Sequence, residues 1–229
     1  MKIVTLIGVR GSGKTTTVTQ LIKAIRARGE TVGTCKSIGC PAFSIDQKGT
    51  NTRRHMLAGA SLVCARGKRE TSFIHPERLP VSRILRHFEG MDWVLLEGDA
   101  QSPLPRLVAA REEADALERT NEHTLAYVGR IAYTDTHALP HPVFDPLTQA
   151  EDLLRYLDTH LPDTAVTEAL DQPLDDGLTQ RNALFCAAGC THHGKQAVTV
   201  TIGGEEVRLT EEQKKEILSW FQEDPGLCP

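Results

Sequence analysis

Gly8-Val9-Arg10-Gly11-Ser12-Gly13-Lys14-Thr15 is the stretch that decides the fold of this chain. It matches G-x-x-x-x-G-K-[ST], the phosphate-binding loop of P-loop nucleotide-binding proteins. An apolar run over residues 3–7 precedes it and predicts a short buried strand. The residues that follow place apolar side chains at helical spacing, at Val18, Leu21, Ile22 and Ile25. Strand, loop and helix therefore stand in the order that a phosphate site requires.

Each part of this loop suits a bound phosphate. Glycines at positions 8, 11 and 13 let the backbone curl so that successive N–H groups face one anion, and the new helix adds its positive dipole end. We expect Lys14 to neutralise charge on the β- and γ-phosphates and the Thr15 hydroxyl to join the Mg²⁺ shell. The loop predicts a nucleotide-binding protein, and it leaves the choice between GTP and ATP open.

Composition narrows the class of protein. The chain has 229 residues, of which 40% are hydrophobic, and a formal net charge of -4, which suits one α/β domain plus an appendage. This charge gives no argument for a nucleic-acid or membrane partner, and no run approaches the ~20 apolar residues of a membrane span. Because the first residues lead directly into the predicted strand, we expect no signal peptide and a cytoplasmic location. Its six cysteines are then expected to be thiols or metal ligands rather than disulfides.

Two further strands complete the predicted nucleotide site. Residues 31–36 form a second strand after the helix, and strand, helix and strand at this spacing predict a βαβ unit with parallel pairing. Residues 93–97 are apolar until Glu97, as in a central parallel strand. The carboxyl ends of such strands meet the ligand, so Glu97 is the candidate acid that acts on Mg²⁺ through water or on the attacking water. The fold class is therefore α/β: a P-loop NTPase with a mostly parallel sheet flanked by helices.

The remaining patterns predict a first domain over 1–161, a linker over 162–184 and a small β-β-α module over 185–229. Cys64 is expected to be a buried thiol on a strand, and Asp145 to cap a helix that runs to His160, with Pro146 at its first position. Segment 112–118 is charged and is expected to be exposed. The other predicted elements are helices over 51–60 and 81–88, strands over 61–65, 107–110 and 125–128, a hairpin over 197–209, and a helix from 210.

A cluster of thiols and imidazoles near the C-terminus is the second candidate for chemistry. Cys186 and Cys190 are followed by His192 and His193, and these residue types bind Zn²⁺ or iron–sulfur clusters. The C-x-x-x-C spacing is not that of a common zinc knuckle, so reduced thiols are the alternative. Cys228 is a third possible ligand.

Several motifs together resemble one family, the molybdopterin-guanine dinucleotide biosynthesis protein B (MobB) family. The similar features cover about residues 1–160. They are the phosphate loop, a strand that ends in Cys35-Lys36, D-Q-K-G at 46–49, R-R-H-M-L-A-G-A at 53–60, L-E-G at 96–98 and S-P-L-P-R at 102–106.

The resemblance implies a GTP-binding, weakly GTP-hydrolysing accessory protein of molybdenum cofactor synthesis. Such proteins are dimers that assist the enzyme attaching GMP to molybdopterin, so that enzyme or a molybdoenzyme is the expected partner. Carried over by position, Glu97 is the acidic residue of the second nucleotide motif. The expected nucleotide-binding set is Gly8, Arg10, Gly11, Ser12, Gly13, Lys14, Thr15, Thr16 and Lys36. No N-K-x-D guanine-reading motif is present, so GTP is chosen over ATP by the resemblance.

The chain departs from the family pattern after Lys36, where Ser37-Ile38-Gly39-Cys40 replaces a histidine-rich stretch. Asn51 stands where an aspartate is usual, and Asp99 stands where an aromatic residue is usual. The first two changes remove groups that could bind a metal or sense phosphate.

Three other functions stay open. A small-molecule kinase needs arginines over the phosphates, which Arg53, Arg54, Arg66 and Arg69 could supply. A nucleotide-dependent metallochaperone would use the cysteines to deliver a metal. A nucleotide-gated adaptor would use the C-terminal module to recruit a partner.

Overall fold

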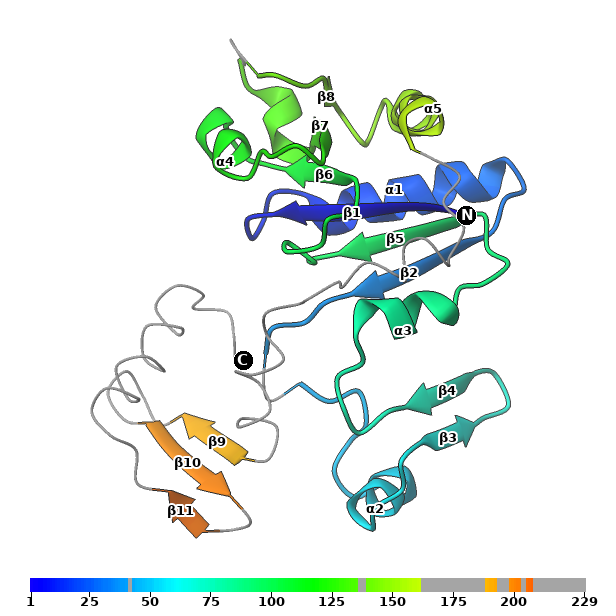
Figure 1. The fold of residues 1–229 in the computed structure, drawn as a ribbon, viewed down its shortest axis with the longest axis vertical. Coiled ribbons are helices and arrows are strands. Elements are labelled where there is room, and N and C mark those ends of the chain that lie inside the picture. The colour runs from blue at the N-terminus through cyan, green and yellow to red at the C-terminus, as the bar shows by residue number, and fades with distance from the viewer. Residues whose placement is uncertain (41–42, 136–138, 162–187, 193–197, 203–204, 208–229) are drawn as a thin grey trace. The chain divides into compact units, whose positions relative to one another are not determined.

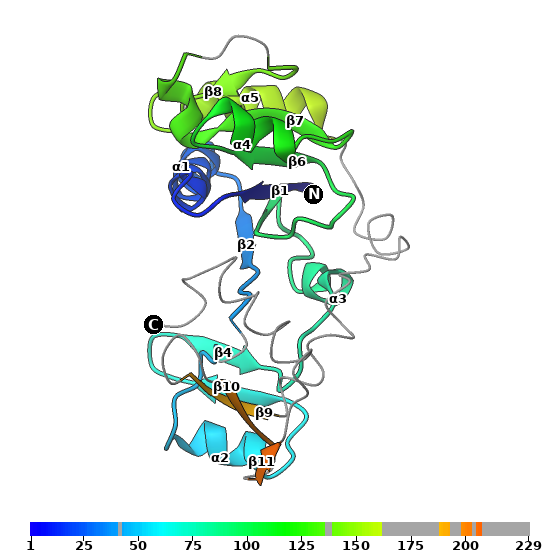
Figure 2. The same ribbon diagram turned by 90° about the vertical axis from the view of Figure 1, so that its left-hand side faces the viewer.

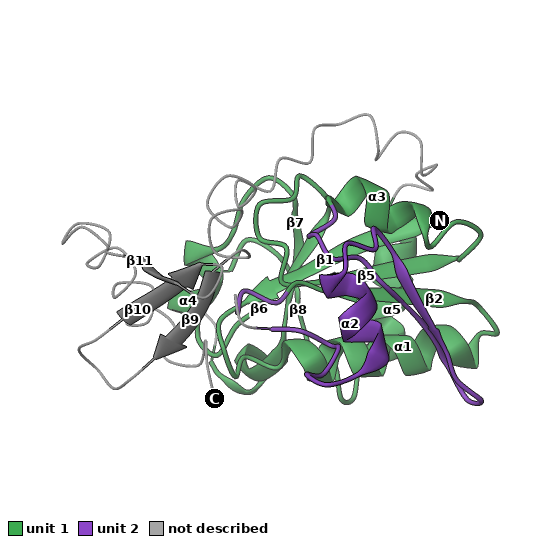
Figure 3. Cartoon of the chain, turned by 90° about the horizontal axis from the view of Figure 1, so that it is seen from below, with its two compact units in different colours: residues 1–37, 80–176 green, residues 38–79, 177–229 purple. Residues whose placement is uncertain are grey.

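The computed structural model describes residues 1–40, 43–135, 139–161, 188–192, 198–202 and 205–207. The chain divides into two compact units: residues 1–37 with 80–176, and residues 38–79 with 177–229 (Figure 3). Within the described residues, no helix is long and apolar enough to cross a membrane.

The first unit is built on a six-stranded parallel sheet with the strand order β2-β5-β1-β6-β7-β8 (Figure 1). This confirms the predicted α/β fold with a parallel sheet. The strands are β1 (Lys2–Gly8), β2 (Val32–Lys36), β5 (Trp93–Glu97), β6 (Arg106–Ala109), β7 (Thr124–Val128) and β8 (Val143–Phe144).

Helices cover both faces of this sheet. On one face α1 (Lys14–Ala27) and α5 (Ala150–His160) pack against alternate side chains of the strands, such as Val4 and Leu95. On the other face lie α3 (Val81–Arg86), α4 (Glu113–Glu118) and the 3-10 helix η1 (Gly129–Tyr133). Figure 2 shows α1 and α3 on opposite sides of the sheet. The long apolar runs of the sequence follow from this burial on both faces.

The order of the strands corrects one expectation. We predicted that β1 and β2 pair directly, but β5 lies between them and pairs with both. The five residues of β5 are all buried, so this strand needs neighbours on both edges and cover on both faces. The parallel direction of the βαβ unit is as predicted.

One local prediction in this unit is wrong, and a second holds only in part. The last long helix begins at Ala150, and Asp145 instead accepts hydrogen bonds from the Leu147 backbone N–H and the Thr148 hydroxyl in the preceding turn. The charged segment 112–118 forms the short helix α4 from Glu113 on; residues 112, 114, 117 and 118 are exposed as predicted, whereas Asp115 is buried. Asp115 accepts hydrogen bonds from Arg111, which lower its pKa and make its burial tolerable.

The second unit contains α2 (Asn51–Leu57) and the antiparallel hairpin β3 (Val63–Arg66) and β4 (Thr71–Ile74). Thr50 caps α2 by accepting from the Arg53 N–H, close to the predicted start. Cys64 is exposed, so the prediction of a buried thiol is wrong: among the described residues, its strand pairs with β4 in a two-stranded sheet. The unit also contains a three-stranded antiparallel sheet of β9 (Ala188–His192), β10 (Val198–Ile202) and β11 (Glu205–Val207), which includes both strands of the predicted hairpin. The helix predicted from 210 lies outside the described residues.

Candidate nucleotide site

The phosphate loop leaves the carboxyl end of β1 and turns tightly before α1. Gly8, Gly11 and Gly13 have φ values of 146°, 72° and 104°, a range that side chains other than glycine rarely adopt. Gly8 is also needed for space, because a Cβ there would lie 1.9 Å from the Ala109 carbonyl oxygen. Ser12 is fully buried, and both its N–H and its hydroxyl donate to the Val9 carbonyl. The three glycines thus allow the curled backbone that the sequence predicts.

The start of α1 is well suited to an anion. Gly13 is the residue before the helix, no side chain caps the first turn, and no acidic residue lies in it. The N–H groups of the first helical turn, at the positive end of the helix dipole, are therefore available to bind an anionic ligand. Thr15 and Thr16 are exposed at this end, as are Arg10 and Gly11 in the loop.

Lys14 lies over the loop itself. Its Nζ donates to the carbonyl oxygens of Gly8 and Val9 at 2.8 and 2.6 Å. An ammonium group held at the loop backbone stands beside the amides that would receive a phosphate, so the structure places the predicted lysine where its charge is useful.

Three polar groups from three elements meet next to the loop. Glu97 ends β5 and is 7% exposed, and its Oε1 accepts from Lys36 Nζ at 2.9 Å and from Thr15 Oγ1 at 3.2 Å. Parallel pairing produces this meeting, because Lys36 and Leu6 are both register partners of Glu97. The structure therefore brings together the predicted residues Thr15, Lys36 and Glu97.

A carboxylate and a hydroxyl at this spacing fit Mg²⁺. The ion prefers oxygen ligands and usually keeps several waters and phosphate oxygens with only one or two protein groups. Thr15 and Glu97 offer such oxygens at the start of α1, and the Lys36 ammonium balances the buried carboxylate.

Sequence reasoning missed one contact of the loop. Gly129, the first residue after β7, has a φ of 89° and lies so close to the loop that a Cβ on it would be 2.1 Å from the Ser12 carbonyl oxygen. The N–H of Arg130 donates to the same oxygen at 3.0 Å. A glycine directly after the apolar strand 124–128 was the only local signal, and glycines in such places are common.

The predicted cysteine site lies largely outside the described residues. The backbone around Cys190 forms β9, while Cys186, His193 and Cys228 lie outside the described part of the chain. Within the described part, no three histidine, cysteine, aspartate or glutamate side chains gather as metal ligands. A zinc or iron–sulfur site stays a prediction.

The sequence and the fold are both similar to those of one known protein family. A family model described as molybdopterin guanine dinucleotide synthesis protein B (MobB) matches residues 3–130. The crystal structure of Bacillus subtilis MobB is similar at 24% identity with a TM-score of 0.57, over 72% of this chain and 100% of that one. A MobB homologue from Bacillus stearothermophilus is similar at 22% identity with a TM-score of 0.54, over 69% of this chain and 99% of that one.

At these sequence identities, the structural similarity is evidence for the fold alone. The comparison with curated proteins finds no match. The family model, however, spans more than half of the chain. The chain therefore belongs to the MobB family, which has a role in the synthesis of molybdopterin guanine dinucleotide.

Proposed function

We propose that this protein binds GTP with Mg²⁺ at the phosphate loop, hydrolyses it slowly, and thereby assists the enzyme that attaches GMP to molybdopterin. The observation that carries the proposal is the meeting of Thr15, Lys36 and Glu97 beside the uncapped start of α1. A cytoplasmic location remains our expectation for it.

The proposed chemistry divides among the residues by position. Backbone amides from Gly11 to Thr16 bind the phosphate oxygens, and Lys14 balances charge on the β- and γ-phosphates. Bound Mg²⁺ would offset the charge that develops between these phosphates, with Thr15 and Glu97 as its protein-side groups. Glu97 also orients the attacking water, and Lys36 holds the carboxylate in place through their ion pair.

The choice of guanine over adenine follows from family membership. Molybdopterin guanine dinucleotide carries GMP, so a protein in its synthesis works where GTP is the nucleotide in use. The direct test measures nucleotide turnover by the full chain with GTP and with ATP, alone and with candidate phosphate acceptors. Slow GTP turnover that is independent of acceptors supports the proposal. Turnover that requires an acceptor identifies a kinase instead, and metal release coupled to turnover identifies a metallochaperone.

We also propose a homodimer, and exposed apolar side chains in residues 38–79 support it. Within the described residues of this segment, Val63 is a buried apolar side chain, while six large apolar side chains are exposed. They are Ile38, Phe43, Ile45, Leu57, Leu62 and Phe73. Exposed apolar side chains in such number are typical of a surface that is covered in an assembly. Light scattering is expected to give a dimer mass for the full chain, and Phe73→Ser with Leu57→Ser is expected to shift it toward the monomer; a wild-type monomer would rule the dimer out.

A further inference from the structure

The connection after Glu97 is fixed at both ends by β1. Residues 98–105 join β5 to β6, and Gly98 opens the segment with a φ of 92°. The Gly98 N–H donates to the Leu6 carbonyl, and at the other end the Pro105 carbonyl accepts from the Thr5 N–H, both at 2.9 Å. A change in the path of this segment would therefore displace Glu97, the residue that directly precedes it.

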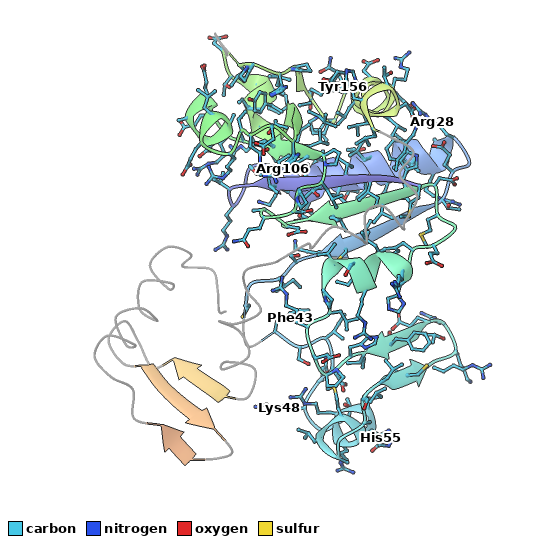
Figure 4. The ribbon with its side chains drawn as sticks, in the orientation of Figure 1. Arg28, Phe43, Lys48, His55, Arg106 and Tyr156 are labelled. Carbon is cyan, nitrogen blue, oxygen red and sulfur yellow. The ribbon has the colours of Figure 1, made fainter. Side chains whose placement is uncertain are left out.

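Arg106, labelled in Figure 4, is the first residue of β6, and it binds the middle of this segment. Its side chain folds back so that Nη1 donates to the Ala100 carbonyl at 3.2 Å and Nη2 to the Ser102 carbonyl at 2.5 Å. The two carbonyls are two residues apart, a spacing that the rigid fork of a guanidinium can bridge and a lysine ammonium cannot match.

Burying the Arg106 guanidinium costs free energy that burying an apolar side chain would not cost. Arg106 is 5% exposed, and its hydrogen bonds within the described residues go to carbonyl groups rather than to a carboxylate. Its Nε and the hydroxyl of Thr5, its register partner on β1, are both buried without a hydrogen-bond partner in the described structure. Burial lowers the pKa of Arg106, and the negative charges of Asp99 and Glu122 oppose this effect.

An apolar side chain of similar size would fill the same space without leaving a buried charge. The fold of the sheet does not need the guanidinium, because the neighbouring positions on this face, such as Ile7 and Leu96, are apolar. What the guanidinium supplies is the hold on Ala100 and Ser102. The carbonyl of Ala100 is three residues after Glu97, with Gly98, the position most free to rotate, between them.

We propose that Arg106 is a positioning residue, which restrains the segment 98–105 so that Glu97 keeps its place beside Thr15 and Lys36. The proposal rests on the proposed function for its effect on turnover, and on the structure alone for its effect on the segment. Arg106 is not proposed to contact a phosphate; it affects Glu97 only through the segment 98–105.

The test compares Arg106→Met and Arg106→Lys in the full chain, with Arg155→Met as a control on the exposed face of α5. Arg106→Met is expected to keep the melting temperature and the GTP dissociation constant, because the phosphate loop is untouched, while kcat falls about 10- to 100-fold. Arg106→Lys is expected to recover part of kcat. The Leu104 N–H donates to the Ser102 hydroxyl, and the Gly98 N–H to the Leu6 carbonyl. Amide hydrogen exchange at both is expected to quicken in Arg106→Met while exchange in α1 does not change.

Three results would overturn the proposal: wild-type kcat in Arg106→Met, equal losses of kcat, affinity and melting temperature, or unchanged exchange at Gly98 and Leu104. If Arg106→Met does not fold, Arg106→Lys decides by the same comparison of kcat with affinity. If the wild-type protein neither binds nor hydrolyses GTP, the proposed function fails, and the exchange measurement still decides whether Arg106 holds the segment.

Discussion

Replacing Gly129 by alanine is predicted to damage the phosphate loop from a distance of more than 100 residues along the chain. In the structure Gly129 has a φ of 89°, and a Cβ on it would lie 2.1 Å from the Ser12 carbonyl oxygen and 3.2 Å from the Ser12 carbonyl carbon. The added atom meets backbone, which cannot rotate away as the end of a side chain can.

The size of the effect follows from two contributions. A residue other than glycine at positive φ costs about 1–2 kcal/mol. A Cβ is essentially never closer than 3.0 Å to a non-bonded heavy atom outside its own and adjacent residues, so Ser12 and Gly129 must also move apart by about 0.9 Å. Misplacing a substrate-positioning group by about 1 Å can cost about 10²-fold in rate, and Ser12 lies within the loop that positions the phosphates. We therefore expect at least a tenfold rise in the GTP dissociation constant, which is about 1.4 kcal/mol of binding free energy.

Gly29→Ala is the matched control. Gly29 follows α1 with a φ of 79°, and a Cβ there would meet no atom within 4 Å. It should lose about 1–2 kcal/mol of unfolding free energy through backbone strain alone and bind GTP with unchanged affinity. The assay is titration calorimetry of both folded variants after thermal unfolding has been recorded by circular dichroism. Wild-type affinity in a folded Gly129→Ala variant would refute the contact between Gly129 and the phosphate loop as a determinant of the site.

Other changes give simpler outcomes. Lys14→Ala should remove measurable GTP binding in calorimetry, because a positioned charge in a phosphoryl-transfer site contributes several kcal/mol; binding at wild-type strength would show that the site is misassigned. Glu97→Gln should keep GTP affinity and lower kcat about 10²-fold in a phosphate-release assay, and a larger loss of affinity than of kcat would contradict its role. Burial alone would raise the pKa of Asp158, but hydrogen bonds from Lys2 and Arg28 lower it below its usual value. The stability that Asp158 contributes should therefore be present above pH ~4 and be lost as pH falls through its lowered pKa. The difference in melting temperature between wild type and Asp158→Asn should shrink on acidification, and a constant difference would show that the ion pairs do not stabilise the fold.

The parts of the fold that sequence alone could predict are those fixed by neighbouring residues. The phosphate loop, α1 and the strands on either side of it are continuous in the sequence, so their residue types and spacing were sufficient. The end of β5 was also predictable, because four apolar residues followed by an acid mark a buried strand that reaches the ligand edge.

Contacts between distant segments could not be read from the sequence. The insertion of β5 between β1 and β2 depends on which strand buries most, and the contact of Gly129 with Ser12 depends on where β7 ends. The prediction that Cys64 is buried was wrong for the same reason. A short apolar strand is buried only if it joins the main sheet, and β3 pairs with β4 instead. Lys36 was expected from family resemblance, whereas its ion pair with Glu97 needed the register of β2 against β5.

Titration calorimetry of the full chain with GTP and with ATP, each in the presence of Mg²⁺, tests the central claim most directly. We predict that GTP binds at one site per chain, more tightly than ATP, and that Lys14→Ala abolishes the signal. Absence of binding by either nucleotide, or equal binding by wild type and Lys14→Ala, would contradict it.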